Sequence, residues 1–275
     1  MSPVEAVRGA EVRLAENGVP SPRVDAELLV AHVLGLTRTG IYENGRFITR
    51  EEAEQLTALV ARRAEREPLA YVLGEWGFRR LSLRVDRRVL VPRPETEVVV
   101  ERSLELIADL EAPAVLDVGT GSGAIALSIA DEHPGARVTA VDSSPDALAV
   151  ARDNARRLGL ERRVELAESD LLAGVSGSFD LVVSNPPYVS PSERSWLEPE
   201  VRDFEPSVAV VGYEVGNRIA AEALRVLRPG GWLVLECGDG QATDLAGSLR
   251  ELGCDRVIVS PDLAGVDRVV EGRGP

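Results

Sequence analysis

The chain has 275 residues, of which 44% are hydrophobic, and a formal net charge of −14. This length suits one large domain plus a small one, and no stretch approaches the roughly 18–20 uninterrupted apolar residues of a membrane-spanning helix. The acidic balance argues against sequence-independent binding to nucleic acid, whose phosphates demand a basic surface. The N-terminus carries charges throughout and has no apolar signal core, so we expect a cytoplasmic protein.

The cysteines and histidines give no support for a disulfide or a metal site. Cys237 and Cys254 are far apart and form no CxxC pair, so we expect buried, reduced thiols. His32 and His133 are also distant in sequence, and we predict no bound metal.

The first part of the chain has a helical pattern. Apolar residues recur at helical spacing in three segments, which are residues 4–16, 22–35 and 51–66. Ser21 and Thr49 are plausible N-caps, and Gly35 lies just past a helix end. Residues 1–75 are therefore predicted to form a small helical domain.

The pattern changes after residue 75. Alternation in "LSLRV" and the run "VDRRVLV" predict a β-hairpin over residues 76–92. We place this hairpin in a connector, residues 76–93, with the domain boundary near residues 90–94. A helix is then expected to begin within "RPETEVVVERSLELIADL".

Strands and helices alternate from residue 113 onward. The predicted strands are residues 114–118, 137–142, 163–167, 179–184, 231–237, 255–260 and 266–270. The predicted helices are residues 123–132, 145–158, 216–228 and 240–252. Such alternation is typical of an α/β domain with a mostly parallel sheet covered on both faces, here residues 94–275.

A glycine-rich turn joins the first of these strands to a helix, in "VLDVGTGSGAIALSIA". Gly119, Gly121 and Gly123 allow a sharp turn and a close approach by a ligand. Alone this is weak evidence, because dinucleotide-binding folds use G-x-G-x-x-G and many turns carry structural glycines. Here the third glycine comes one position early, which favours a different nucleoside cofactor.

Acidic residues follow the next strands. Asp142 ends "RVTAVD" and is placed to accept hydrogen bonds from a ribose, although it or one of the two following serines could cap the next helix. Asp170 could accept from an adenine amino group, and Leu171 could pack on adenine or against the sheet. Asp117 could meet the cofactor's ammonium group or serve as a buried partner for a backbone N–H.

The most informative motif is Asn185-Pro186-Pro187-Tyr188, after the apolar run "FDLVVS". The Asn185 carboxamide oxygen and the Pro186 carbonyl can accept the two hydrogens of a planar NH2 group, because the prolines fix the backbone direction. Tyr188 offers a flat face for stacking. With the glycine turn and the acidic residues, the motif predicts a methyltransferase that uses S-adenosylmethionine to alkylate an amide or exocyclic amine.

Further segments carry a resemblance. "REPLAYVLGEWGF", "VLVPRPETE", "FDLVVSNPPYVSP", "EVRDFEPSVAV" and "DLAGVDRVV" closely resemble the HemK-type peptide chain release factor glutamine methyltransferases, in order over essentially the whole chain. The NPPY motif is shared with enzymes that methylate adenine or cytosine, whereas "PRPETE" together with "RDFEP" is far more specific.

The resemblance implies a Rossmann-like domain with a seven-stranded sheet, and an N-terminal helical domain that recognises the substrate. It also implies the reaction, which is methylation of the side-chain amide nitrogen of the glutamine in the Gly-Gly-Gln loop of class-1 release factors. S-adenosylmethionine is the implied cofactor, and neither nucleic acid nor a membrane is an expected partner.

Site residues carry over by position. The implied cofactor contacts are Gly119, Thr120, Gly121, Ser122, Gly123, Asp142, Leu171 and Asn185, and Asp170 joins them from its position after a strand. The implied substrate contacts are Asn185, Pro186, Pro187, Tyr188, Arg93 and Glu95, of which Asn185, Pro186 and Tyr188 are the catalytic set. Arg93 and Glu95 would shape the glutamine entrance, or alternatively form a salt-bridged N-cap on the next helix.

One stretch departs from the family. After "FEPSVAV" the family usually shows an Asp-Gly-Gly run that leads through an aromatic residue into a helix, whereas this chain has "VGYEVGNRIAAEAL". We therefore expect a differently built lid at residues 212–218. Two rival functions remain at this stage, an amino-methyltransferase acting on a flipped nucleic-acid base and a non-catalytic cofactor-binding adaptor.

Overall fold

The structure, a computed structural model, describes residues 1–43 and 45–275. It divides into two compact units. The first, called the helical unit, comprises Met1–Glu75 together with Glu198–Phe204. The second, called the sheet unit, comprises Trp76–Leu197 and Glu205–Pro275, so it includes the expected connector at residues 76–93.

The helical unit contains the three predicted helices. They are α1 (Pro3–Glu16), α2 (Pro22–Leu34) and α4 (Arg50–Ala64), and the short helices are α3 (Gly40–Glu43), α5 (Leu69–Leu73) and α9 (Pro199–Phe204). Thr49 caps α4 through a reciprocal capping box with Glu52. Ser21 occupies the N-cap position of α2 but makes no capping bond, because its hydroxyl donates to Asp25 instead.

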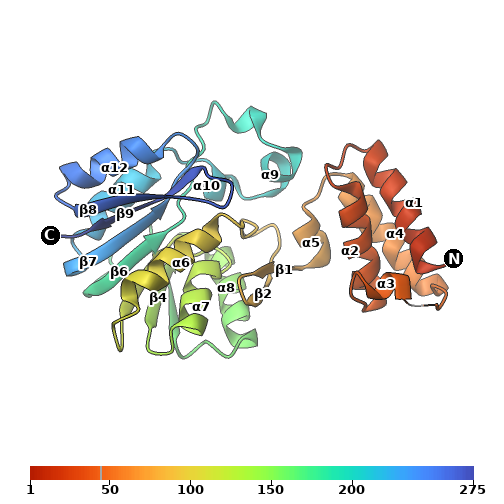
Figure 1. The fold of residues 1–275 in the computed structure, drawn as a ribbon, viewed down its shortest axis with the longest axis horizontal. Coiled ribbons are helices and arrows are strands. Elements are labelled where there is room, and N and C mark those ends of the chain that lie inside the picture. Colours follow the sequence, from red (N-terminus) through yellow and green to blue (C-terminus); the bar gives the residue numbers. More distant parts are fainter. Residues whose placement is uncertain (44) are drawn as a thin grey trace. The chain divides into compact units, whose positions relative to one another are not determined.

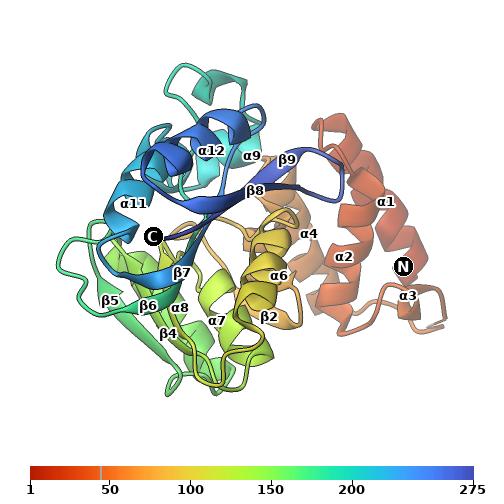
Figure 2. The same ribbon diagram turned by 60° about the vertical axis from the view of Figure 1, so that its left-hand side comes forward.

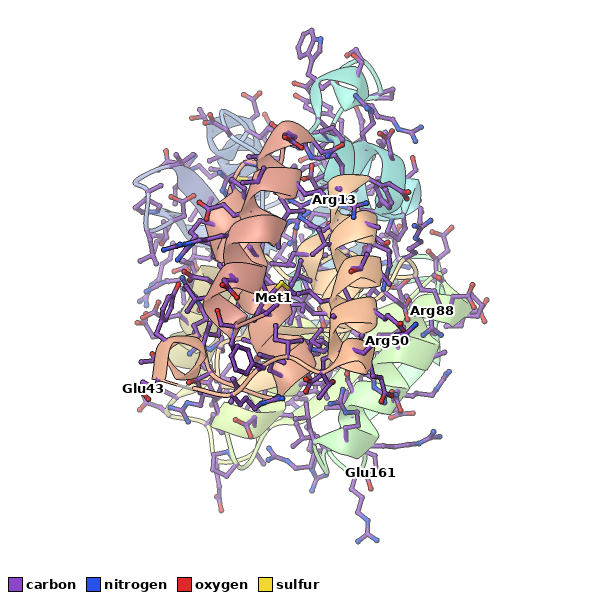
Figure 3. All side chains as sticks on the ribbon, turned by 90° about the vertical axis from the view of Figure 1, so that its right-hand side faces the viewer. Met1, Arg13, Glu43, Arg50, Arg88 and Glu161 are labelled. Atoms are coloured by element: carbon purple, nitrogen blue, oxygen red, sulfur yellow. The ribbon has the colours of Figure 1, made fainter. Side chains whose placement is uncertain are left out.

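The helices of this unit, drawn with their side chains as sticks in Figure 3, pack their apolar faces into one core. Leu14, Leu29, Val30 and Ile41 are fully buried there, and Val60 of α4 joins them. The helical periodicity of the sequence places these residues on inward faces.

A buried ion-pair cluster holds residues 198–204 within the helical unit. Arg63 is 5% exposed and donates to Asp25 at 2.7 Å and to Glu200 at 2.8 Å. Arg66 donates to the same Glu200 carboxylate at 2.7 and 2.6 Å. Two guanidinium groups therefore share one carboxylate of α9, a segment that lies more than 130 positions later in the chain.

The sheet unit begins with a hairpin that is shorter than expected. Its strands are β1 (Glu75–Phe78) and β2 (Leu81–Arg84). The prediction of strand structure up to residue 92 is wrong, because Asp86 closes a turn. Its carboxylate accepts from the backbone N–H and the guanidinium of Arg88, and its carbonyl accepts from the N–H of Val89.

The main sheet has seven strands, as predicted. They are β3 (Ala114–Val118), β4 (Arg137–Asp142), β5 (Val164–Glu168), β6 (Phe179–Ser184), β7 (Leu227–Glu236), β8 (Asp255–Pro261) and β9 (Asp267–Arg273). The order is β5-β4-β3-β6-β7-β9-β8. Neighbouring strands from β5 to β7 pair in parallel, and β9 runs antiparallel to both β7 and β8. The mostly parallel α/β architecture is confirmed.

Helices cover both faces of this sheet (Figures 1 and 2). One face carries α6 (Thr96–Ile107), α7 (Ala124–Glu132) and α8 (Pro145–Arg157). The other face carries α11 (Val215–Ala223) and α12 (Ala242–Glu251). Short elements between β6 and α11 in the sheet unit are η1 (Arg194–Trp196) and α10 (Ser207–Val210). The central strands are therefore apolar on both sides, as the continuous runs in the sequence indicate.

One boundary differs from the prediction by several residues. The helix predicted over residues 216–228 ends at Ala223, and β7 begins at Leu227. The early start arises because Leu227 pairs with Phe179 of β6, and a register shift then brings Trp232 opposite Leu181. Gly230, with φ +75°, takes up the irregularity between the two pairings.

In the part of the chain that the structure describes, no helix combines the length and hydropathy needed to cross a bilayer. The described residues also contain no cluster of three or more metal-ligating side chains.

Candidate active site and cofactor pocket

A pocket opens at the carboxyl ends of the parallel strands, where α/β folds bind their ligands. It has a cavity volume of about 290 Å³, near the lower end of the range usual for small-molecule sites. Its walls come from the turns after β3, β4, β5 and β6, from residues 88–90 after the hairpin, and from the segment around α10 and α11. All of these residues belong to the sheet unit.

The glycine turn after β3 forms one wall. Gly119 and Gly121 line the pocket with φ of +75° and +57°, and a Cβ on either would meet nothing within 4 Å. A ligand can therefore approach this backbone closely. Gly123 differs, because a Cβ there would lie 2.8 Å from Leu127 Cδ1. Its role is packing of α7 against the turn.

The residues between these glycines face inward. Thr120 is 6% exposed and donates its hydroxyl to Asp117 at 2.7 Å. Ser122 is 3% exposed, and its carbonyl accepts from Asn154 at 2.9 Å. The Thr120 side chain and the Ser122 carbonyl stabilise the turn, and neither residue is among those that line the pocket.

Asp142 joins two turns at the end of β4. One carboxylate oxygen accepts from the Gly121 N–H at 2.8 Å, and the other accepts from the Ser144 N–H at 2.9 Å. The N-cap of α8 is Ser144, whose hydroxyl accepts from the Ala147 N–H. Asp142 is therefore not needed as the cap, and it lines the pocket with unused acceptor capacity.

Asp170 and Leu171 line the pocket after β5. Leu171 adopts a left-handed backbone with φ +50° and packs against the core on one face of the sheet, so packing against the sheet is confirmed and packing on adenine stays a prediction. Asp117 is fully buried, accepts from the Ala126 N–H, and does not line the pocket. The interpretation as a backbone partner is confirmed for Asp117, and burial raises the pKa of its carboxyl to about 7.

Asn185 follows the last residue of β6 and reaches the pocket. Its amide nitrogen donates to the Thr96 hydroxyl at 2.9 Å, and this hydroxyl donates to Glu236 at 2.7 Å. The carboxamide oxygen of Asn185 is buried and has no hydrogen-bond partner among the described residues. A buried acceptor without a partner costs about 1–3 kcal/mol, so this oxygen marks a place for a donor from a ligand.

The two prolines and Tyr188 are held tightly. Pro187 lines the pocket, and a Cβ on Gly212 would lie 2.7 Å from its ring, so the glycine permits close packing. Pro186 and Tyr188 line a smaller adjacent cavity. The Tyr188 carbonyl accepts from the Gln241 side chain at 3.0 Å, and burial raises the pKa of the Tyr188 phenol to about 12. The phenol is therefore neutral at physiological pH.

Arg93 and Glu95 have separate environments. Arg93 donates to both carboxylate oxygens of Glu205 at 2.7 Å, and the Glu205 side chain is 1% exposed. Glu95 occupies the N-cap position of α6 but makes no capping bond. The alternative of a salt-bridged N-cap is therefore wrong. Neither residue is among those that line the cofactor pocket.

Residues 212–218, where the sequence differs from the family pattern, form part of the pocket wall beside the Asn185-Pro186-Pro187-Tyr188 motif. Val189 pairs with Val211 in a parallel bridge, and the Gly212 N–H donates to the Val189 carbonyl at 3.0 Å. The Val215 N–H donates to the Gly212 carbonyl at 2.9 Å, and α11 begins there. Val211, Val215 and Arg218 thereby line the pocket, so this chain builds its wall without the family's Asp-Gly-Gly run.

Several lining residues were not singled out from the sequence. They include Arg88, Val89, Leu90, Pro206, Val208, Ala209 and Arg218. Val89 and Leu90 lie within "VLVPRPETE", and α10 lies within "EVRDFEPSVAV". Both segments carry the resemblance, so these positions could have been identified from the sequence.

The comparisons with known proteins are consistent with this geometry. A relative from Deinococcus radiodurans, named release factor glutamine methyltransferase, is 46% identical over 96% of this chain and 95% of its own length. The chain belongs to the release factor glutamine methyltransferase family. A relative of the same name from Rhodospirillum rubrum is 43% identical over 95% of this chain and 82% of its own length.

Two family models match separate parts of the chain, one in the helical unit and one in the sheet unit. The PrmC N-terminal domain matches residues 5–74, and the methyltransferase small domain matches residues 100–197. Among solved structures, the T. thermophilus 16S rRNA N2 G1207 methyltransferase in complex with AdoMet and guanosine has a TM-score of 0.54 at 18% identity, and covers 73% of this chain and 50% of that one. This likeness supports the Rossmann-like methyltransferase fold.

Proposed function

We propose that this cytoplasmic protein methylates the side-chain amide nitrogen of the glutamine in the Gly-Gly-Gln loop of class-1 translation release factors, using S-adenosylmethionine. The observation that carries the proposal is the buried, unpartnered oxygen of Asn185 beside the glycine-lined pocket. It provides a hydrogen-bond acceptor where a methyl donor and an amide can meet. The names of the relatives support glutamine of a release factor as the acceptor.

The pocket fits S-adenosylmethionine. The backbone at Gly119 and Gly121 is open to a ligand, the Asp142 carboxylate can accept from the ribose hydroxyls, and Leu171 offers an apolar surface for adenine. Asp170, also in the wall, can accept from the adenine amino group. The bound cofactor supplies an electrophilic methyl group on a sulfonium.

The protein's contribution is to position a weak nucleophile, since the lone pair of an amide nitrogen is delocalised into its carbonyl. Asn185 Oδ1 and the Pro186 carbonyl accept the two N–H bonds of the glutamine side chain. This holds the nitrogen in line with the methyl group and offsets the positive charge that develops on nitrogen. The proton leaves to solvent after transfer, so no strong base is required. Tyr188, which is neutral, stacks on the planar amide.

Arg93 and Glu95 lie before α6, where we place the entrance for the glutamine loop. The N-terminal helical domain, residues 1–75, recognises the body of the release factor away from that loop. Deletion of residues 1–75 should raise the Michaelis constant for whole release factor much more than for a short Gly-Gly-Gln peptide. Equal effects on the two substrates would exclude this role.

The assay that decides the function follows labelled methyl transfer from S-adenosylmethionine. The acceptors are purified release factor, the same factor with its loop glutamine replaced, bulk RNA and bulk DNA. Label on the unmodified factor alone supports the proposal. Label on nucleic acid alone would establish the amino-base function, and cofactor binding without transfer to any acceptor would establish the adaptor function.

A further inference from the structure

Three side chains from different elements form a hydrogen-bonded chain beside the pocket. Asn185 Nδ2 donates to Thr96 Oγ1 at 2.9 Å, and Thr96 Oγ1 donates to Glu236 Oε2 at 2.7 Å. Thr96 is 4% exposed and Glu236 is 1% exposed. Neither is among the residues that the sequence comparison with the family assigned to the site.

The fold explains why these residues meet. Asn185 follows Ser184, the last residue of β6, and Glu236 is the last residue of the neighbouring parallel strand β7. Thr96 is the first residue of α6, which packs on the same two strands. The Ser184 hydroxyl donates to the Val118 carbonyl at 2.6 Å and so fixes the end of β6 beside β3.

The hydrogen bonds that link Asn185, Thr96 and Glu236 have a defined donor-to-acceptor direction. A hydroxyl carries one proton, and Thr96 donates it to Glu236 Oε2, an oxygen that accepts both in the ionised carboxylate and in the neutral carboxyl with its proton on Oε1. Thr96 Oγ1 can then only accept from Asn185, so the amide nitrogen of Asn185 must face Thr96. The opposite atom, Asn185 Oδ1, is consequently left free for a ligand, and it has no partner among the described residues.

We propose that Thr96 and Glu236 are positioning residues that hold the carboxamide of Asn185 with its oxygen toward the substrate amide. This inference rests on the proposed function, because that function supplies the N–H donor. Without the hydrogen bonds from Asn185 to Thr96 and from Thr96 to Glu236, which we call the relay, the carboxamide could rotate by half a turn. It would then present its NH2 group to the NH2 group of glutamine. Two donors form no hydrogen bond, so such an orientation is unproductive.

The kinetic test compares two substitutions at one position. Thr96→Val keeps the shape of the side chain and removes the hydroxyl, whereas Thr96→Ser keeps the hydroxyl. We expect Thr96→Val to lower kcat for release factor methylation roughly tenfold or more with little change in KM, because a small loss of orientation is costly in a positioned reaction. Thr96→Ser should restore most of the rate. Equal losses in both variants would contradict the proposal.

A double-mutant cycle separates positioning from a general structural effect. If Thr96 acts through Asn185, adding Thr96→Val to Asn185→Ala should lower the residual rate no further. A purely structural role predicts the same fold loss in both backgrounds. That additive result would overturn the inference.

A second readout needs no substrate. The chain has five asparagines, so protein labelled with ¹⁵N-asparagine gives few side-chain amide signals, and the Asn185 signal is the one missing in Asn185→Ala. Thr96→Val and Glu236→Gln should shift this signal, and Thr96→Ser should leave it close to its original position. An unchanged signal in Thr96→Val would show that the relay does not exist. If the wild-type enzyme fails to methylate release factor, the proposed function falls, and this measurement still decides the relay.

Discussion

Arg93 and Glu205 join the two sequence motifs that are most specific to this family. Arg93 belongs to "PRPETE" and Glu205 to "RDFEP", 112 positions apart, and the guanidinium donates to both carboxylate oxygens at 2.7 Å. The Glu205 side chain is 1% exposed. The ion pair therefore ties the start of α6 to the start of α10, which contributes part of the pocket wall.

We predict that Arg93→Ala destabilises the protein. Breaking a fully buried ion pair costs about 3–5 kcal/mol in the free energy of unfolding, and we expect a loss at or below the lower end of this range, because the Arg93 side chain is 31% exposed. Burial already raises the pKa of the Glu205 carboxyl, so the loss should be smaller at acidic pH, where this carboxyl becomes neutral. Urea unfolding of wild type and variant at pH 8 and pH 5 measures both effects.

Arg225→Ala provides the matched control. Arg225 pairs with Glu222 at 3.6 Å, and its side chain is 65% exposed. Exposed pairs contribute at most about 1 kcal/mol. Similar decreases in the free energy of unfolding for Arg93→Ala and Arg225→Ala would show that the Arg93–Glu205 pair stabilises the protein no more than an exposed pair does.

The sequence predicted the architecture well, and for physical reasons. Mostly apolar runs such as "VLDV" and "FDLVVS" predicted the strands β3 and β6 at their observed bounds, because strands buried on both faces consist mainly of apolar residues. The buried Asp117 in β3 is accommodated because its carboxylate accepts from Thr120 and Ala126. The boundary at β7 was missed, because its start depends on pairing of Leu227 with Phe179, a contact that local periodicity does not encode.

The site was predicted only in part. Asp142, Asp170, Leu171 and Asn185 line one pocket, because each ends or follows a parallel strand at the same edge of the sheet, and their contacts with the cofactor stay a prediction. The link from Thr96 to Glu236 spans 140 positions, and no spacing rule predicts such a contact. Thr120 and Ser122 lie within the predicted turn, but their inward direction depends on three-dimensional packing.

Asp142→Ala should weaken cofactor binding. The carboxylate holds the Gly121 N–H at 2.8 Å and provides the acceptors proposed for the ribose, and hydrogen bonds to charged groups contribute about 1.5–3 kcal/mol each. We therefore expect the Kd for S-adenosylmethionine to rise about tenfold to a hundredfold in calorimetric titration. Asp146→Ala, an exposed change of the same charge four positions later, should leave the Kd unaltered. A normal Kd for Asp142→Ala would exclude the assigned role.

Gly212→Ala tests whether the pocket wall formed by residues 212–218 must pack closely against Pro187. The new Cβ would lie 2.7 Å from Pro187 Cγ and 2.9 Å from Val215 Cγ2, so one of these groups must move. We expect slower methyl transfer, because displacement of the motif by a fraction of an ångström disturbs a positioned reaction. Gly247→Ala in α12, where a Cβ meets nothing within 4 Å, is the control and should slightly stabilise the helix. Wild-type turnover in Gly212→Ala would show that the wall is not coupled to the motif.

Glu236 should make stability depend on pH. The pKa of this carboxyl is raised from 4.5 to about 7, chiefly by burial and also by Glu95, against the lowering effects of Thr96, Arg268 and Arg93. Between these pKa values the native state binds more protons than the unfolded state, so this contribution to stability falls as pH rises from about 4.5 to about 7.

Glu236→Gln removes this contribution. Since each pKa unit corresponds to about 1.4 kcal/mol, the variant should gain on the order of 3 kcal/mol relative to wild type between pH 4.5 and pH 8. Unfolding in urea across this range measures the gain. A constant difference between variant and wild type would show that Glu236 titrates normally.

The central claim is that Asn185 positions the glutamine amide for methylation. The most direct measurement is the rate of methyl transfer to release factor by Asn185→Ala, together with its affinity for S-adenosylmethionine. Loss of one directed interaction in the transition state costs about 3–4 kcal/mol, so we predict a rate at least ~10² lower with the cofactor still bound. A rate close to wild type, with normal cofactor affinity, would contradict the assignment of the chemistry to this residue.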